Sequence, residues 1–381
     1  MKIAQVSPYD VRHPGGVAEH IRHLRAELLR LGHEVIVIAP RSSKGGIEIG
    51  DGFYGIGRPV SIPGNGSRVR LTFDVTLYAE VKRLMAVEQF DVVHLHEPGV
   101  PVLPHMVLLN SKAVNVATFH AFRPSNPWYT AFKPALSPIL GRLDARIAVS
   151  EPAREFVSQY FEGPYEIIPN GIDPERFGGE VEPLVWARTD GPRILFVGRF
   201  EEQRKGFKYL LKALPLVQQQ FPTARLVVVG TGNPEKFASV MERYEVRGVD
   251  FIGFVPAEEL PRYYAACDVF CAPSVRGESF GLVLLEAMAS AKPVVASDIP
   301  GYASVMTSGA EGLLVPPKDH QALALALARI LADQDLRRRL SETGPVTAAL
   351  YAWPRVAARV VEAYLAAAEN AASASWRRSF V

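Results

Sequence analysis

The chain has 381 residues, of which 48% are hydrophobic and 22% are charged, and its formal net charge at pH 7 is +2. These values are typical of a soluble enzyme with two domains, and the small net charge argues against bulk nucleic-acid binding. The two cysteines, Cys267 and Cys271, are too few to cross-link a chain of this size, so we expect a reducing, cytoplasmic compartment.

Predicted strands and helices alternate in the first part of the chain. Lys2–Val6 is a predicted buried strand, and it leaves no room for a signal peptide. The turn at Gly15 and Gly16 then opens a helix that is predicted over 17–31. Further strands are predicted at 34–39, 91–96, 114–119, 145–150 and 165–169. This alternation predicts a parallel doubly wound sheet that binds ligands at the carboxyl ends of its strands.

Residues 41–70 interrupt this alternation, because they are rich in Gly, Pro and Ser. We predict a long irregular excursion with a functional role. An amphipathic helix is then predicted over 74–87, with one apolar side that carries Val75, Tyr78, Val81 and Met85. We hypothesise that nearby cations contact anionic lipid on the inner face of the plasma membrane, and these are Arg68, Arg70, Lys82 and Arg83.

Six residues follow the predicted strands at the carboxyl ends, where ligands bind in such sheets. They are Tyr9, Gly15, Gly16, Glu97, His120 and Ser150. His120 follows a buried strand directly, so we expect it to face the binding crevice. A purely structural role for this histidine stays open at this stage.

A second series of strands and helices follows a connector predicted over 169–192. Its strands are predicted at 193–199, 225–230, 249–253, 269–273 and 293–297. From about residue 321 the chain is helical, and the last helix, predicted over 356–372, is expected to return to the first domain. We therefore predict domains at 1–173 and 174–355, followed by a returning segment at 356–381.

The segment Arg-Phe-Glu-Glu-Gln-Arg-Lys-Gly contains two candidate phosphate ligands, Arg199 and Lys205. A guanidinium binds two oxygens at once, and an ammonium acts as a point charge, so the two side chains fit a diphosphate. A solvated charged loop is the alternative, because Glu201 and Glu202 lie between them.

The stretch from Arg276 to Pro293 combines glycines, acids and a helix N-terminus. The backbone around Phe280, Gly281 and Leu282 is predicted to present unpaired N–H groups that bind phosphate or sugar oxygens. Glu278 precedes the helix and Glu286 lies within it, and both are candidate hydroxyl ligands. A nucleotide sugar fits this pattern, whereas an ordinary strand-to-helix loop with one capping acid is the alternative.

Taken together, three motifs resemble the retaining glycosyltransferases of family 4, which have the GT-B fold. They are Pro-Gly-Gly near the start, Val-Gly-Arg followed by Arg-Lys-Gly, and Gly-Glu-Ser-Phe-Gly-Leu-Val-Leu-Leu-Glu-Ala-Met-Ala. The resemblance covers nearly the whole chain and implies an α/β protein with two Rossmann-like doubly wound domains that face an interdomain cleft. Within the family, the chain is most similar to the mannosyltransferases that transfer mannose from GDP-mannose to phosphatidylinositol.

The resemblance also implies roles for individual residues. Gly16, Arg199 and Lys205 are expected to bind the diphosphate, Glu278 the mannose and Glu286 the ribose. His120 is expected to lie against the reacting sugar. The residues expected to face the inositol phosphate of the lipid or polyol acceptor are Tyr9, Asn65, Ser67 and Arg70.

No pair of acids suits a double displacement, so we hypothesise a front-face attack in which the departing diphosphate takes the acceptor proton. His120, Arg199, Lys205 and Glu278 are then the expected catalytic residues. No Asp-x-Asp motif lies in or next to the segments that carry the candidate site residues, so we expect that no metal cofactor is required, and a dependence on Mg²⁺ stays open. The alternatives are a transferase that uses a UDP-sugar and another acceptor, a nucleotide-sugar epimerase, and a non-catalytic nucleotide-binding module.

Overall fold

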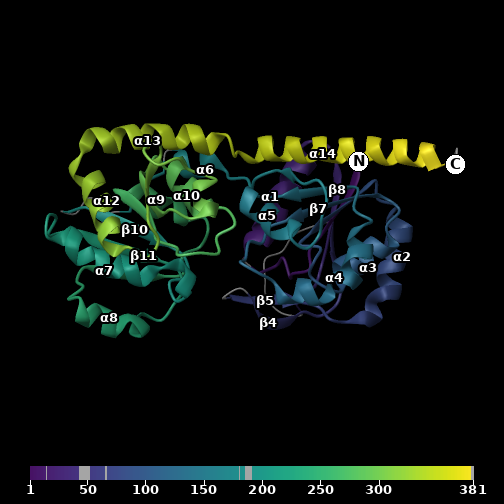
Figure 1. Cartoon of the computed structure of the whole chain (residues 1–381). Coiled ribbons are helices and arrows are strands. Elements are labelled where there is room, and N and C mark those ends of the chain that lie inside the picture. The colour runs from purple at the N-terminus through teal and green to yellow at the C-terminus, as the bar shows by residue number, and fades with distance from the viewer. Residues whose placement is uncertain (14, 43–51, 65–66, 180, 185–190, 379–381) are drawn as a thin grey trace. The chain divides into compact units, whose positions relative to one another are not determined.

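The computed structural model describes residues 1–381 except 14, 43–51, 65–66, 180, 185–190 and 379–381 (Figure 1). The chain forms two compact units, the first of Met1–Gly171 with Trp353–Val381 and the second of Ile172–Ala352. The boundaries predicted from the sequence lie two and three residues away from these. Among the described residues, no helix is both long and apolar enough to span a bilayer.

The first unit is built on a parallel sheet with the strand order β3-β2-β1-β6-β7-β8-β9. Its strands are β1 (Lys2–Val6), β2 (Glu34–Ala39), β3 (Phe53–Gly55), β6 (Val92–His96), β7 (Val114–Phe119), β8 (Ala145–Ala148) and β9 (Glu166–Ile167). The central strands β1, β6 and β7 are almost wholly buried, as expected for a parallel sheet that helices cover on both faces.

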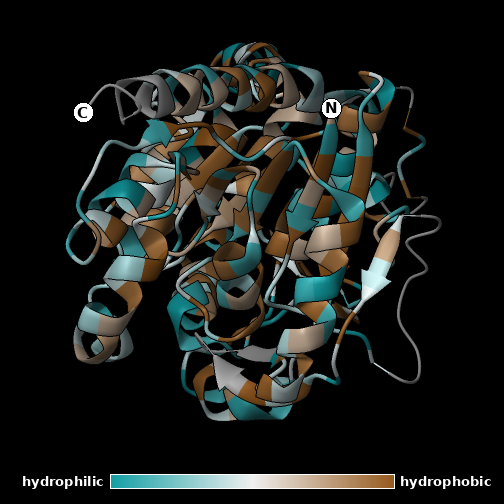
Figure 2. Ribbon diagram, turned by 90° about the vertical axis from the view of Figure 1, so that its right-hand side faces the viewer, coloured by the Kyte–Doolittle hydropathy of each residue, from teal (hydrophilic) through white to brown (hydrophobic). Residues whose placement is uncertain are grey.

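Helices cover both faces of this sheet. The helices α1 (Gly16–Arg30) and α14 (Trp353–Arg378) pack their buried leucines, valines and alanines on one face. The other face carries α2 (Tyr78–Glu88), α3 (Leu103–Asn110), α4 (Pro127–Leu140) and α5 (Glu151–Ser158). In Figure 2, brown hydrophobic residues alternate with teal hydrophilic ones along the helices, as this one-sided packing requires.

The last helix belongs to the first unit through specific polar contacts as well as through packing. The Tyr364 hydroxyl lies 2.7 Å from His94 Nδ1, and Arg359 Nη2 donates to the carbonyl oxygen of Ile167 at 2.6 Å. The helix therefore packs against the first sheet.

The expectation of an irregular excursion over 41–70 is wrong for the part that is described. β3 joins the edge of the sheet beside β2, and β4 (Val60–Gly64) forms an antiparallel hairpin with β5 (Ser67–Leu71). Pro63 does not prevent this pairing, because in a two-stranded hairpin every strand is an edge strand.

The helix predicted over 74–87 needs a correction at its N-terminal end. Asp74 caps a 3₁₀ turn, η1 (Val75–Leu77), and the α-helix α2 begins only at Tyr78. Val75 and Tyr78 are 69% and 45% exposed, and the buried side chains are instead Val81, Leu84 and Met85. The tighter 3₁₀ turn rotates the first apolar residues away from the core.

The second unit contains a parallel sheet with the strand order β12-β11-β10-β13-β14-β15. Its strands are β10 (Arg193–Val197), β11 (Arg225–Val229), β12 (Val249–Gly253), β13 (Val269–Ala272), β14 (Val294–Ser297) and β15 (Gly312–Val315). The predicted connector over 169–192 contains a short helix, α6 (Pro174–Gly178), whose N-terminus Asp173 caps.

Two sets of helices enclose the second sheet. Its first face is covered mainly by α7 (Phe207–Gln218), α8 (Ala238–Arg243) and α12 (His320–Ala332). Its second face is covered mainly by α6, α9 (Leu260–Ala266), α10 (Leu282–Ala289) and α11 (Pro300–Ala303), with the end of α13 (Gln334–Ala349). The carboxyl ends of β10 and β13 lead directly into the two polar segments that the sequence analysis singles out.

Candidate active site

Glu278 is the centre of a polar cluster in the second unit. Its Oε1 atom accepts hydrogen bonds from Arg204 Nη1 at 2.7 Å, Lys205 Nζ at 2.8 Å and Ser274 Oγ at 3.1 Å. Ser274 Oγ in turn lies 2.8 Å from the buried Tyr302 hydroxyl. The Oε2 atom of Glu278 has no hydrogen-bond partner among the residues that the structure describes, so it is available to a ligand hydroxyl.

The backbone fixes the two cations against this carboxylate. Arg204 and Lys205 lie in a 3₁₀ turn, η3 (Gln203–Lys205), which ends at Gly206 with φ 67°. A Cβ atom at Gly206 would overlap the carbonyl oxygen of Pro273, which follows β13. The Val275 amide also donates to the Arg204 carbonyl at 2.7 Å. The turn after β10 is therefore packed directly against the loop after β13.

The cluster carries a net positive charge. Glu202 links the other members, since its Oε1 lies 2.8 Å from Arg199 Nε and its Oε2 lies 2.7 Å from Arg204 Nη2. Three cations and two carboxylates thus leave one positive charge in this network. Burial raises the pKa of Glu278, but the charges of Lys205 and Arg204 outweigh it and hold the pKa below its ordinary value. The carboxylate is therefore ionised at neutral pH, and the surplus charge suits an anionic ligand.

The helix after this loop supplies backbone donors. α10 begins at Leu282, and the Leu284 amide already donates to the carbonyl of the capping residue Gly281 at 2.8 Å. The N–H groups of Leu282 and Val283 are the ones that a helix N-terminus leaves without a carbonyl partner in the helix. The Phe280 side chain is only 5% exposed and packs against Tyr351, so any ligand contact of Phe280 must come from its backbone. At Gly281, a Cβ atom would come within 3.1 Å of the Tyr302 ring.

Glu286 lies on α10, where the Tyr264 hydroxyl donates to its Oε2 atom at 2.7 Å. Tyr264 is fully buried, and burial together with the Glu286 charge raises the pKa of its hydroxyl well above the ordinary value. The tyrosine thus orients the carboxylate while leaving it half-buried. This partner is missing from the sequence analysis, because Tyr264 lies twenty-two positions earlier in the chain.

In the first unit, Glu97 holds the backbone at His120. Its Oε1 atom accepts from the His120 amide and, at 2.7 Å, from the Ala121 amide. Glu97 is 4% exposed and has a φ of 50°, a conformation that costs energy in a residue other than glycine. Such strain at a buried carboxylate indicates that the position of the loop 120–121 is tightly specified.

His120 belongs to a cluster of four histidines, which we define as His20, His94, His96 and His120. His96 Nδ1 lies 3.2 Å from His120 Nε2, and His20 Nδ1 lies 2.9 Å from Asn170 Oδ1. His94 Nε2 lies 2.7 Å from Thr118 Oγ1. His20, His94 and His96 are buried, whereas His120 is half-buried and is the member nearest to solvent.

The chemistry of this cluster favours neutral imidazoles. Ring nitrogens of His20, His96 and His120 lie within 4.8 Å of one another, close enough to share one metal ion. Nitrogen ligands suit Zn²⁺, whereas Mg²⁺ prefers oxygen, so the cluster is no Mg²⁺ site. Burial, followed by repulsion from neighbouring histidines, lowers the pKa of His96 and His120 well below the ordinary value. Of the cluster, the sequence analysis finds only His120.

The cluster makes the stability of the first unit depend on pH. Burial lowers the pKa of His20 to about 4 and that of His94 to about 3, from an ordinary 6.5. As the pH falls below 6.5, the unfolded chain binds protons that the folded chain rejects. Stability is therefore complete above pH 6.5 and is lost as the pH falls towards 4. Between pH 7 and pH 5 we expect the free energy of unfolding to fall by a few kcal/mol.

Hydrogen exchange of β6 and β7, corrected for the intrinsic effect of pH, measures this change. His94→Gln removes one of the four clustered histidines whose pKa is lowered, so its loss of unfolding free energy between pH 7 and pH 5 is expected to be smaller than that of the wild type. An equal loss in both proteins would contradict the assignment to the buried histidines.

The structure places two of the predicted acceptor residues side by side. Tyr9 forms an antiparallel bridge with Leu71, and the Asp10 amide donates to the Arg70 carbonyl at 2.9 Å. Burial and the Glu97 charge raise the pKa of the Tyr9 hydroxyl. Tyr9 is therefore close enough to interact electrostatically with Glu97, the carboxylate that holds the loop at His120. For Ser67 only the backbone, in β5, is described, and Asn65 lies outside the described residues.

The two cations among the predicted diphosphate ligands, Arg199 and Lys205, differ in exposure and in the carboxylate that each contacts. Lys205 is 14% exposed and contacts Glu278, whereas Arg199 is 48% exposed and contacts Glu202. Arg204, which the sequence analysis passes over, is the arginine that contacts Glu278. Gly16 opens α1, and nothing lies within 4 Å of the place where its Cβ would be, so the backbone there is open to a ligand.

Comparisons with known proteins agree with these features. A model described as Glycosyltransferase Family 4 matches residues 14–176, and one described as Glycosyl transferases group 1 matches residues 185–346. The phosphatidyl-myo-inositol mannosyltransferase of Mycobacterium tuberculosis is 38% identical over 373 residues, which cover 96% of each protein. An uncharacterized glycosyltransferase of Methanocaldococcus jannaschii is 31% identical, covering 97% of this chain and 99% of the relative. The solved structure of sucrose-phosphate synthase from Thermosynechococcus elongatus has a TM-score of 0.72 at 25% identity, covering 95% of this chain and 98% of that one.

Proposed function

Because the chain belongs to the group 1 glycosyltransferases of family 4, a retaining family with the GT-B fold, we propose that it transfers mannose from GDP-mannose to a phosphatidylinositol-type lipid. The full-length similarity to phosphatidyl-myo-inositol mannosyltransferases supports mannose as the transferred sugar and phosphatidylinositol as the acceptor. The contact of Glu278 with Arg204 and Lys205 is the structural observation that carries the proposal.

The donor binds through the charge network of the second unit. Lys205 uses one N–H for Glu278 and keeps the others for the diphosphate, which the amides at the start of α10 also bind. The open Oε2 atom of Glu278 accepts from a hydroxyl of the sugar. Glu286, oriented by Tyr264, binds the ribose hydroxyls. Arg199 is the outer cation and stabilises the network through Glu202.

The reaction proceeds on one face of the sugar. The bond between C1 and the leaving phosphate oxygen breaks as the acceptor oxygen attacks C1 from the same side, and the acceptor proton passes to the departing diphosphate. The positive network stabilises the charge that develops on this leaving group, an effect typically worth a few kcal/mol per donor. In the first unit, Glu97 and His96 hold His120, the residue that the family resemblance assigns to the reacting sugar.

The acceptor binds to the first unit, near Tyr9, Arg70 and the hairpin of β4 and β5. Apolar side chains next to this hairpin are exposed, namely Phe73 at 48%, Val75 at 69% and Tyr78 at 45%. On α2, Lys82 and Arg83 are also exposed. Apolar and cationic side chains in one segment suit peripheral contact with an anionic membrane, where the lipid acceptor resides.

Product analysis tests the proposal. The protein is incubated with GDP-mannose, UDP-glucose or UDP-N-acetylglucosamine, each with and without phosphatidylinositol vesicles, and the lipids are analysed by mass spectrometry before and after digestion with an α-mannosidase. We expect a mannosylated phosphatidylinositol from GDP-mannose only, with the mannose in the α configuration. If glycolipid forms from a UDP-sugar instead, the proposed donor GDP-mannose is wrong and the donor is that UDP-sugar. An isomerised donor without acceptor would indicate an epimerase, and nucleotide binding without sugar release would indicate a binding module.

A further inference from the structure

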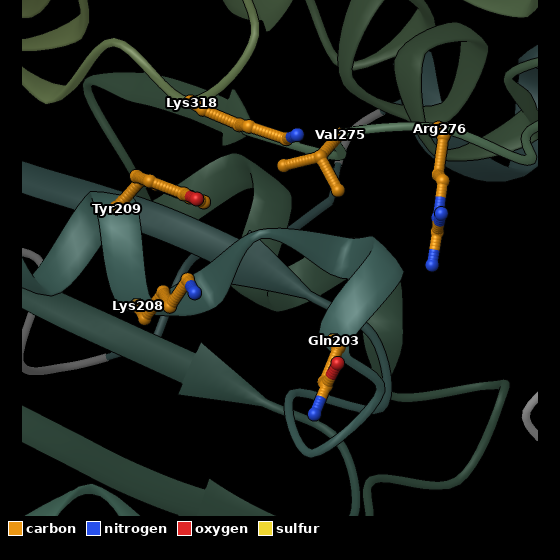
Figure 3. A pocket seen from close by; sticks show the side chains of 6 residues that line it. All are labelled: Gln203, Lys208, Tyr209, Val275, Arg276 and Lys318. Atoms are coloured by element: carbon orange, nitrogen blue, oxygen red, sulfur yellow. The ribbon is translucent and has the colours of Figure 1, made fainter.

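The second unit contains a pocket of about 210 Å³ beside the charge network. Its lining is drawn in Figure 3 and consists of Gln203, Lys208, Tyr209, Val275, Arg276 and Lys318. These residues come from η3 and the start of α7, from the loop after β13 and from the loop after β15. We call it the basic pocket. Neither Glu278 nor the cations that contact it line this space.

The basic pocket has positive charge without compensating acids. Lys208, Arg276 and Lys318 are exposed around it, and its lining includes no carboxylate. Among the described residues, none of the three cations has an ion pair. Asp319, the acid next to Lys318 in sequence, instead accepts from the amides of Gln321 and Ala322 and caps α12. Three uncompensated cations around one space repel one another, and a bound anion relieves that repulsion.

The backbone adds to the positive electrostatic potential of the basic pocket. α7 has twelve residues and begins at Phe207, so Lys208 and Tyr209 lie in its first turn, where the helix dipole is positive. Figure 3 shows the side chains of Lys208 and Lys318 reaching towards the same space from two different segments, with the Tyr209 hydroxyl also facing it. Lys318 has a φ of 69°, a costly backbone conformation for a lysine. The arrangement therefore offers ammonium, guanidinium, hydroxyl and amide donors to one ligand.

We propose that the basic pocket binds a phosphate group, separately from the diphosphate of the donor. A water molecule occupies about 30 Å³ in the liquid, so the pocket has room for a phosphate together with the first atoms of the group it is attached to. A phosphomonoester suits three cations better than a carboxylate does, because it carries nearly two negative charges at pH 7. The ligand is either a soluble phosphorylated compound or the phosphate of an anionic lipid headgroup.

Calorimetric titration with inorganic phosphate at low ionic strength tests the site. Lys208→Ala/Lys318→Ala is expected to bind phosphate at least about tenfold more weakly than the wild type, because it lacks two charge-assisted donors. Arg339→Ala removes an exposed cation on α13 and is expected to bind phosphate like the wild type. Lys205→Ala alters the donor network but leaves the basic pocket intact, so it is expected to keep the phosphate binding that Lys208→Ala/Lys318→Ala loses.

Two results would overturn the proposal. One is phosphate binding that survives Lys208→Ala/Lys318→Ala but is lost in Lys205→Ala, which would place the anion on the donor network. The other is an absence of phosphate binding by the folded wild type. Because Lys208, Lys318 and Arg339 are exposed, the thermal unfolding of their variants is expected to be unchanged and serves to verify folding. The titration requires neither donor nor acceptor, so it is independent of the outcome for GDP-mannose.

A second arm distinguishes the two sources of phosphate. Co-sedimentation is measured with vesicles of phosphatidylcholine alone and with vesicles of equal parts phosphatidylcholine and phosphatidic acid. If the headgroup is the ligand, Lys208→Ala/Lys318→Ala loses binding to the acidic vesicles. If that variant sediments like the wild type but has lost inorganic phosphate, the ligand is a soluble phosphorylated compound.

Discussion

Lys205→Ala is expected to lower kcat for sugar transfer by about a hundredfold or more. The Lys205 ammonium lies 2.8 Å from Glu278 Oε1 and is the least exposed of the three cations in the network. In the proposed reaction its charge stabilises the diphosphate most strongly when the bond to the sugar is breaking. Its removal therefore acts on the transition state more than on the bound substrate, and kcat falls together with kcat/KM.

Steady-state kinetics with GDP-mannose and phosphatidylinositol measures this effect. Lys212→Ala is a matched control, because Lys212 is also on α7 and its Nζ lies 4.8 Å from the ring centroid of Tyr244. The control is expected to keep kcat. If Lys205→Ala lowers kcat by less than about tenfold, which corresponds to about 1.4 kcal/mol, Lys205 does not stabilise the transition state as proposed.

Gly206→Ala is expected to have the largest effect on stability, lowering the free energy of unfolding of the second unit by about 3 kcal/mol or more. Two costs add at this position. The φ of 67° is unfavourable for alanine, and the new Cβ atom would overlap the Pro273 carbonyl, which is backbone and cannot rotate away. The turn that carries Arg204 and Lys205 must shift, so we also expect activity to fall.

Gly253→Ala separates these two costs. Gly253 also has a positive φ, 85°, but nothing lies within 4 Å of the place where its Cβ would be. We expect it to lose only the conformational part, about 1 kcal/mol. Denaturant unfolding of the two variants measures the difference. Equal losses would show that the contact between Gly206 and Pro273 adds nothing, and that the position of the turn does not depend on it.

The strands and helices could be predicted from the sequence where hydrophobic periodicity is strong. β1, β6 and β7 are continuous apolar segments, and the order of helices and strands predicts parallel sheets. The predictions fail where local rules do not decide the structure. Residues 53–71 have the composition of a loop, yet β3 pairs with β2 at the edge of the sheet. This pairing is with residues outside the segment, so the composition of the segment does not predict it. The first turn of the helix predicted over 74–87 is 3₁₀, and hydrophobic spacing alone does not distinguish it from α.

The candidate site shows the same division. Motifs predict Glu278, Glu286 and Lys205 as ligand-binding residues, because the residue types and spacings are specific. The choice of Arg204 over Arg199 depends on the φ of Gly206 and on the Pro273 carbonyl, and neither can be inferred from the order of charges in the segment. His96 is the last residue of β6 and Glu97 follows it, whereas His120 follows β7. Only the pairing of these two strands brings them into contact.

We propose that the network around Glu278 binds the diphosphate of the donor. Calorimetric titration with GDP and with guanosine, on the wild type and on Lys205→Ala, tests it most directly. We predict that Lys205→Ala binds GDP at least about tenfold more weakly and guanosine with unchanged affinity, because guanosine has no diphosphate. If the substitution leaves the affinity for GDP unchanged, or weakens the binding of both ligands equally, the network does not bind the diphosphate.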